Sequence, residues 1–307
     1  MSLPVGVTLA EGVPRDQLRI VTPLGIRFRD VAIDEPITHG LVVMSKAKPF
    51  EGGPTQVRPN LSGVLGFHSL PLLHDVEYPS PFAGPLPSPP SSFPFVVMAS
   101  DRLGRFLPVV FGIDLPLNAL PSPPVLDIDP DPAPLLDAYL FTAPTRPVTC
   151  GFAAIRADLW DRETRAGAAH ALVRVTVGDR EMRGVADERG RLLILLPYPL
   201  LERLRLGSPP GTGQHPPYEH SWPVSLAAFY RPDLARPFGD EEVLPTPWTR
   251  LPGLKGILES QDPAWIWPAP AGPPVMTWTG TLTYDHELVV RTQTVSELWI
   301  SRGASPP

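Results

Sequence analysis

The sequence predicts an all-β protein made of tandem small β-sandwich domains joined by proline-rich extended linkers. Two observations predict this class. The chain holds 44 prolines in 307 residues, and proline is excluded from helix interiors and central strands. Hydrophobic residues make up 43% of the chain, and they fall in short runs bounded by turn-forming residues, as in β-sandwiches. Long helices are therefore not expected.

A first β domain is predicted at residues 18–117, after an N-terminal arm at 1–17. Turn-forming residues separate its apolar runs, and Asp101–Gly104 is expected to form a hairpin loop with Gly104 at positive φ. Residues 79–94 contain alternating proline and small residues, which predicts a stiff polyproline-like insertion. The strands expected in this domain are 18–28, 41–45, 63–68, 95–100 and 105–113.

A proline-rich linker is predicted at residues 118–146, with at most one helical turn, at 133–139. It contains the acidic run Asp127-Ile-Asp-Pro-Asp131, whose alternate carboxylates could converge on Ca²⁺. Pro132 stands where a tight calcium loop needs glycine, so a solvated acidic linker is the preferred interpretation.

The clearest domain is predicted at residues 147–232. Turn signals recur every 8–12 residues, including Gly178-Asp179 and a turn that closes on Gly190, which is the spacing typical of a sandwich. The expected strands are 150–160, 171–177, 180–185, 191–196 and 222–230.

This second domain resembles the carboxypeptidase-regulatory-like family of immunoglobulin-like sandwiches. The resemblance rests on Asp161…Thr164…Gly167, on Ala171 before Val173-x-Val175-x-Val177, and on Asp187-x-x-Gly190-x-Leu192-x-Ile194. It covers about 85 residues and consists mostly of turn chemistry. It implies a spacer, stalk or docking module without catalytic residues, and it makes the predicted fold a series of immunoglobulin-like sandwiches.

The C-terminal segment, 233–307, is predicted as a tryptophan-rich β segment that contains five of the seven tryptophans. Tryptophans can fill a core that has few helices, line a sugar-binding face or anchor a protein interface. Core filling is the preferred interpretation for most of them. The residues proposed for an interaction surface are Phe82, Phe93, Trp265, Trp267 and Trp299.

Composition excludes several classes of function. The net charge of −6 leaves no basic stripe for nucleic acid, and no apolar run is long enough to insert into a membrane. No nucleophile–base, phosphate-binding or zinc motif is present, so we expect no enzyme activity, cofactor or metal. Cys150 opens an apolar run and is expected to be a buried, inert thiol.

The whole chain is also similar to proline-rich accessory proteins of contractile injection systems, the phage-tail-like particles. The similar stretches are 18–30, 94–108 and 195–199. This resemblance implies a non-catalytic structural component of the baseplate, cage or cap, whose partners are the other subunits of a multi-subunit particle. We expect synthesis and assembly in the cytoplasm and release with the particle. The alternative is a carbohydrate- or surface-binding β-sandwich module.

Overall fold

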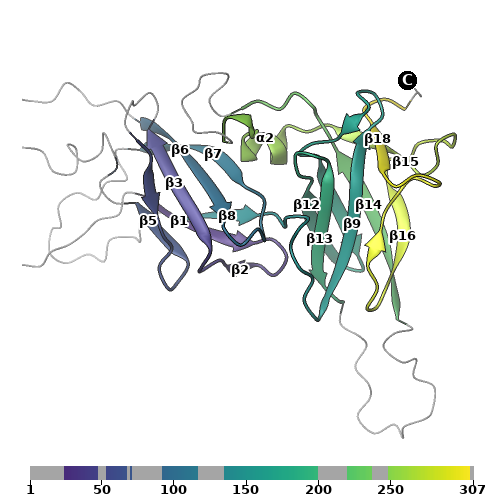
Figure 1. The fold of residues 1–307 in the computed structure, drawn as a ribbon, viewed down its shortest axis with the longest axis horizontal. Helices are drawn as coiled ribbons and strands as arrows, with labels where there is room; N and C mark the ends of the chain where they lie inside the picture. Colours follow the sequence, from purple (N-terminus) through teal and green to yellow (C-terminus); the bar gives the residue numbers. More distant parts are fainter. Residues whose placement is uncertain are drawn as a thin grey trace, which may run out of the picture.

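The structure, a computed structural model, describes residues 24–47, 53–67, 70, 92–116, 135–199, 220–236 and 248–304. It confirms the all-β class. Two β domains lie side by side, and the short helix α2 (Leu254–Glu259) lies between them at one end (Figure 1). No helix in these ranges is long and apolar enough to cross a membrane.

The first domain is a sandwich of two four-stranded sheets. In one sheet β1 pairs with β2 and β5 in antiparallel fashion and with β8 in parallel. The other sheet has the order β4-β3-β6-β7. The strands are β1 (Leu24–Asp30), β2 (Glu35–Pro36), β3 (Leu41–Ala47), β4 (Thr55–Val57), β5 (Val64–Phe67), β6 (Ser92–Asp101), β7 (Val109–Pro116) and β8 (Leu135–Leu140).

The second domain encloses its core between strands that are linked in the order β10-β9-β18-β15-β14-β11-β12. β13 and β17 also pair with β9, and β16 pairs with β14. The strands are β9 (Phe152–Asp161), β10 (Ala166–Gly167), β11 (Leu172–Val177), β12 (Arg180–Val185), β13 (Arg191–Pro197), β14 (Ser221–Phe229), β15 (Pro263–Trp267), β16 (Trp278–Thr283), β17 (Leu288–Val289) and β18 (Leu298–Ser301).

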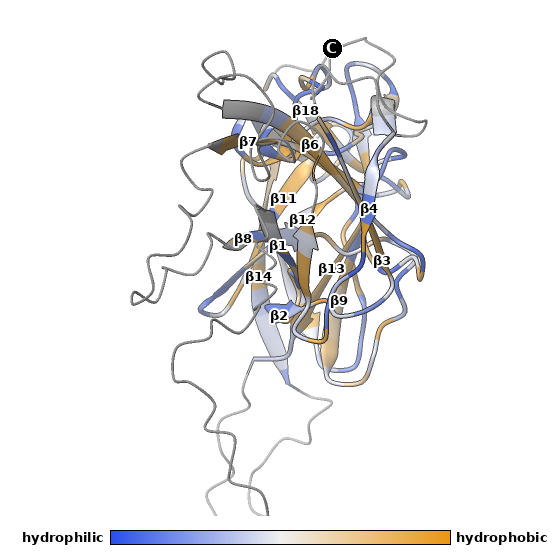
Figure 2. Ribbon diagram, turned by 90° about the vertical axis from the view of Figure 1, so that its left-hand side faces the viewer, coloured by the Kyte–Doolittle hydropathy of each residue, from blue (hydrophilic) through white to orange (hydrophobic). Residues whose placement is uncertain are grey.

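Two strands, β6 and β13, are buried on both faces, and both carry the apolar colour in Figure 2. On β6, Val97 faces the core of the first sandwich, whereas Met98 faces a separate cluster on the other side of the sheet. On β13, Ile194 faces the second core and Leu193 faces outward, into a cluster with Ala32 of the first domain. Side chains alternate between the faces of a strand, so a continuous apolar run requires cover on both sides.

The predicted turns are confirmed. Gly104 has φ +65° and Gly190 has φ +84°, conformations that glycine adopts without a steric penalty. Asp101 closes the β6–β7 turn by accepting a 2.8 Å hydrogen bond from the backbone N–H of Arg105. In the β12–β13 turn, Asp187 accepts a 2.9 Å hydrogen bond from the backbone N–H of Arg191.

The domain boundaries differ from the predicted ones in two places. Residues 135–140, inside the predicted linker, are strand β8 rather than a linker or a helical turn, because they pair with residues 25–30 of β1. Residues 263–301 do not form a separate segment, since β15, β16 and β18 complete the second sandwich. The excised fragment 147–232 would therefore expose much of its own core.

Candidate functional site at the domain junction

A short segment, residues 248–261, connects the two domains, and we call it the clamp. Its 3-10 turn, Trp248–Arg250, places Trp248 over the outward face of β6, against Val96 and Met98. Gly253 then forms a parallel bridge to Val110 of β7. Leu254 of α2 is buried in the core of the first domain.

The other end of the clamp is held by the second domain. The side chain of Gln261 donates a 2.9 Å hydrogen bond to the carbonyl of His170 and another to the carbonyl of Ile257. Two side chains of the second domain, Leu172 and Val185, pack into the core of the first domain beside Ile257. The clamp thus ties both sandwiches to one continuous apolar cluster.

A second contact zone lies on the opposite side of the junction. Ala32, in the β1–β2 turn, packs against Ala154 and Leu195 on the outer face of the β9–β13 pair. A nearly buried ion pair supports this turn: Arg146 Nη2 lies 2.7 Å from Asp30 Oδ2, and the other carboxylate oxygen accepts the Ala32 N–H at 2.8 Å. Removing one partner of such a pair leaves a charge in an apolar setting, which is strongly destabilising.

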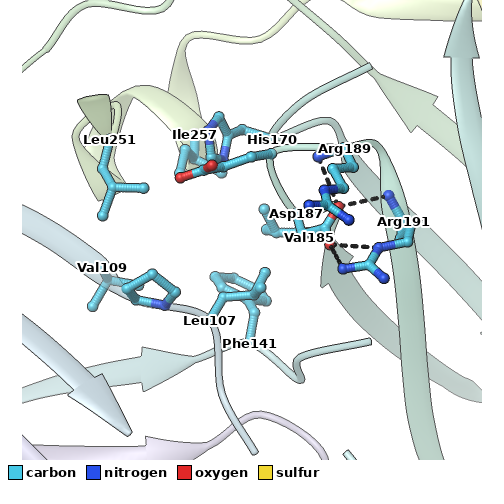
Figure 3. Close-up of a pocket in the computed structure, with 12 residues that line it drawn as sticks. Leu107, Val109, Phe141, His170, Val185, Asp187, Arg189, Arg191, Leu251 and Ile257 are labelled. Atoms are coloured by element: carbon cyan, nitrogen blue, oxygen red, sulfur yellow. Dashed lines mark hydrogen bonds and ion pairs between the residues drawn. The ribbon is translucent and has the colours of Figure 1, made fainter. Parts of the chain in front are cut away.

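Beside the clamp, between residues of the two domains, lies a pocket of about 320 Å³ (Figure 3). This volume is at the lower end of the range for small-molecule sites. Its floor is apolar, and its wall includes charged side chains of the β12–β13 turn. The apolar part is formed by Leu107, Val109, Phe141, Val185, Leu251 and Ile257.

The charged wall of the pocket is rigid. Asp187 accepts 2.9 Å hydrogen bonds from the backbone N–H groups of Arg189 and Arg191, and its second oxygen lies 2.7 Å from the Arg191 guanidinium. Gly190 permits the turn, because a Cβ there would lie 2.3 Å from the carbonyl oxygen of Leu159. Asp187 is therefore fully engaged inside the protein and is poorly placed to act as a general base.

His170 is the one imidazole among the described residues of the pocket lining. Burial lowers its pKa, and the nearby carboxylates of Glu188 and Asp187 offset only part of that effect. Its backbone has φ +59°, a conformation that is uncommon for residues other than glycine. Among the described residues of the lining there is no serine, threonine or cysteine, and most of them are apolar, which suits the packing of an apolar group.

The structure brings the three predicted tryptophans together on the outward face of one sheet. Trp267 of β15 is paired with Trp299 of β18, and Trp299 is paired with Trp160 of β9. Trp265 lies two residues before Trp267 and so on the same face. The interaction surface predicted from the sequence did not include Trp160 or Arg162. Strand register places Trp160 beside Trp299, and Arg162 lies over the Trp267 ring.

This tryptophan face is partly covered. The Arg162 guanidinium lies 3.9 Å from the ring centroid of Trp267 and 5.4 Å from that of Trp299, an arrangement typical of cation–π contacts. Trp267 is only 2% exposed, and its Nε1–H donates a 2.8 Å hydrogen bond to Ser301 Oγ. Trp267 is therefore a packing residue, and any contact surface is left to Trp265 and Trp299.

The remaining sequence-predicted residues do not join either site. Phe82 and the acidic run 127–131 lie outside the described residues, and Phe93 is placed only as a backbone position of β6 that pairs with Leu115. The prediction for Cys150 is wrong: this thiol is exposed, because β9 begins two residues later and Cys150 lies in the turn before it. Within the described ranges, no three His, Cys, Asp or Glu side chains form a potential metal site.

Comparison with known proteins gives no family. No protein-family model and no curated protein matches the chain. Among solved structures, the chain is similar to the TIE protein of Bacillus anthracis, at 11% identity and a TM-score of 0.23 over 68% of this chain and 28% of that one. It therefore spans less than a third of that protein.

Two pilins are similar over a larger share of their length. They are the shaft pilin SpaA of Lactobacillus rhamnosus GG, at 8% identity and a TM-score of 0.21 over 92% of this chain and 99% of that one, and a minor pilin of Streptococcus agalactiae, at 8% identity and a TM-score of 0.22 over 92% and 98%. Because these TM-scores are low, the similarities do not assign a family or a function to the chain.

Proposed function

We propose that this chain is a non-catalytic structural component of a phage-tail-like contractile injection system, in its baseplate, cage or cap, and that it acts through contacts with other subunits. The observation that carries the proposal is the domain junction. Two sandwiches share a buried apolar cluster, and the clamp crosses from one to the other. Domains joined by polar surfaces tend to move relative to each other, whereas a large apolar interface holds them in one orientation.

A fixed orientation is what a part of a particle requires. A subunit that spans neighbours must keep the angle between its binding surfaces, since each contact is made only if the other is in register. The polar network at the junction serves the same purpose, because Arg146 and Asp30 attach the interdomain connection to the first domain.

The stretches that resemble injection-system accessories support the assignment to this kind of particle. Residues 94–108 include most of β6 and the turn that follows it, and residues 195–199 include the end of β13. These are the two strands that are buried on both faces. Two of the three similar stretches therefore lie on the strands on which the junction is built, and the third, 18–30, includes β1.

The proposal can be tested in cells that produce the chain. Sheathed particles are purified by sedimentation, and the chain is measured in the particle fraction by mass spectrometry, before and after deletion of the sheath gene. We expect co-sedimentation with sheath and tube proteins that is lost without the sheath. If the intact chain never enters a fraction that contains particles, the injection-system assignment is refuted.

The alternative function, binding of a carbohydrate or a cell surface, is favoured by the tryptophan face alone. Trp265 and Trp299 are half-buried and lie on the outward face of neighbouring strands, where an indole can stack on a sugar ring. A glycan array probed with the intact chain and with Trp265→Ala tests it. Binding that is lost in the variant would support the alternative, and absence of binding to every glycan would remove it.

A further inference from the structure

A second recess lies on the first domain, where the residues before β3 meet β4 and the β6–β7 turn. Its volume is about 240 Å³. Polar and basic side chains form much of its wall, unlike the apolar floor of the interdomain pocket. They are Thr38, His39, Gln56, Arg58 and Arg102.

The backbone around this recess is held in place by one buried carboxylate. Asp101, whose side chain is fully buried, pairs with Arg105 at 2.9 Å. Arg105 in turn donates a 2.7 Å hydrogen bond to the carbonyl of His39. Gly40 has φ +84°, and a Cβ there would lie 2.7 Å from Asp101 Oδ1. The residue must therefore be glycine for the turn to pack this closely.

Among the described residues, no carboxylate pairs with the two arginines that line the recess. The Asp101 carboxylate already forms an ion pair with Arg105 and accepts hydrogen bonds from two backbone N–H groups. In the part of the chain that the structure describes, neither Arg58 nor Arg102 forms an ion pair. Arginines elsewhere, such as Arg27 with Asp137, do pair with carboxylates.

The neutral side chains in the recess can also donate hydrogen bonds. Arg105 has only donors, and its Nη1 lies 3.4 Å from His39 Nε2. The other ring nitrogen, His39 Nδ1, lies 3.4 Å from Thr38 Oγ1. A hydroxyl can donate as well as accept, so Thr38 adds a possible donor to the wall of the recess.

We propose that this recess is a binding site for an oxyanion, a phosphate or a carboxylate group, held by Arg58 and Arg102. A guanidinium presents a planar fork of N–H donors that matches two oxygens of such a group, and two arginines in the wall of one recess favour an anion over a neutral ligand. The site is separate from the assembly role proposed above. It gives this acidic chain a local positive patch for either a free anion or an acidic side chain of another protein.

The test uses the full chain, labelled with ¹⁵N, and two probes. Inorganic phosphate represents the free anion, and the peptide acetyl-Glu-Glu-Glu-amide represents an acidic side chain. Each is titrated while the backbone amides are followed by NMR at constant ionic strength. The variants are Arg58→Ala and Arg102→Ala, with Arg291→Ala as the control, because Arg291 is an exposed arginine of the second domain and its loss changes net charge equally.

We expect saturable shifts at the amides of residues 38–41 and 102 with at least one probe. Arg58→Ala and Arg102→Ala should each weaken that binding about tenfold or more, because a hydrogen bond between charged groups is stronger than one between neutral groups. The control, Arg291→Ala, should bind as the wild type does. Saturation by phosphate identifies a free anion, and saturation by the peptide alone identifies an acidic side chain. The proposal is overturned if neither probe saturates, or if Arg291→Ala weakens binding as much as the pocket variants.

Discussion

Replacing Gly190 with alanine should destabilise the protein more than the same change at another turn glycine. Gly190 closes the β12–β13 turn at φ +84°, and an added Cβ would meet Leu159 O at 2.3 Å and Ala168 N at 2.9 Å. Both are backbone atoms, so no side-chain rotation relieves the contact. The same turn carries Asp187, and its displacement would disturb the wall of the interdomain pocket.

The magnitude follows from two contributions. A non-glycine residue in the left-handed region costs about 1–2 kcal/mol. Forced overpacking against neighbouring atoms costs about 1–3 kcal/mol more. Gly190→Ala should therefore lower the free energy of unfolding by about 2–5 kcal/mol.

Gly178 provides the matched control. It has φ +63°, but an added Cβ would meet no atom within 4 Å, so Gly178→Ala should cost only the conformational contribution of about 1–2 kcal/mol. Urea unfolding followed by tryptophan fluorescence measures both variants. Equal losses of stability in the two variants would show that the close approach at Gly190 is absorbed by backbone movement, and the reasoning would fail.

Three further predictions concern the junction and two titratable groups. Trp248→Ala should lower the free energy of unfolding by about 3 kcal/mol, because it uncovers the outer face of β6. Urea titration measures the change. The control Lys255→Ala removes an exposed side chain of the same clamp and should have almost no effect. Burial lowers the pKa of His170 in the folded protein. As the pH falls below about 6.5, the unfolded chain therefore binds a proton before the folded chain does. The free energy of unfolding should be highest above pH 6.5 and should fall below it. His170→Asn, which tolerates positive φ, should flatten that pH dependence in thermal melts, and an unchanged slope would contradict the assignment. Burial and Asp161 raise the pKa of Tyr230 to about 12, so stability should fall as pH rises from 10 to 12, where only the unfolded chain loses the proton. A late-titrating phenol in the ultraviolet absorbance should disappear in Tyr230→Phe.

Local sequence was sufficient wherever neighbours along the chain decide the structure. The β11–β12–β13 meander was predictable, because its turns depend on residues that lie within them. Gly178 and Gly190 supply positive φ, and Asp187 caps the backbone N–H groups two and four residues later. Strand β12 occupies the predicted residues 180–185.

The candidate sites depended on long-range register and were mostly missed. Trp265, Trp267 and Trp299 were selected because tryptophans are frequent at interfaces, yet Trp267 proved to be buried beneath Arg162. The recess at Arg58 and Arg102 joins residues that are 44 positions apart, and no local motif marks it. A signal did exist for the clamp: β6 has an unbroken apolar run at 95–99, which implies cover on both faces.

By itself, the sequence determined that the chain is all-β, where most strands lie and which turns need glycine, because proline content, alternation and turn chemistry act over a few residues. Only the tertiary structure decided which strands belong together. Residues 135–140 became β8 because β1 offered a free edge for parallel pairing, and β15, β16 and β18 joined the second sandwich because its core would otherwise be exposed. Trp248 lies between strands of the second domain in the sequence, but its side chain covers β6 of the first domain. Burial of apolar surface does not depend on distance along the chain, and this is why the domain junction could not be derived from local patterns.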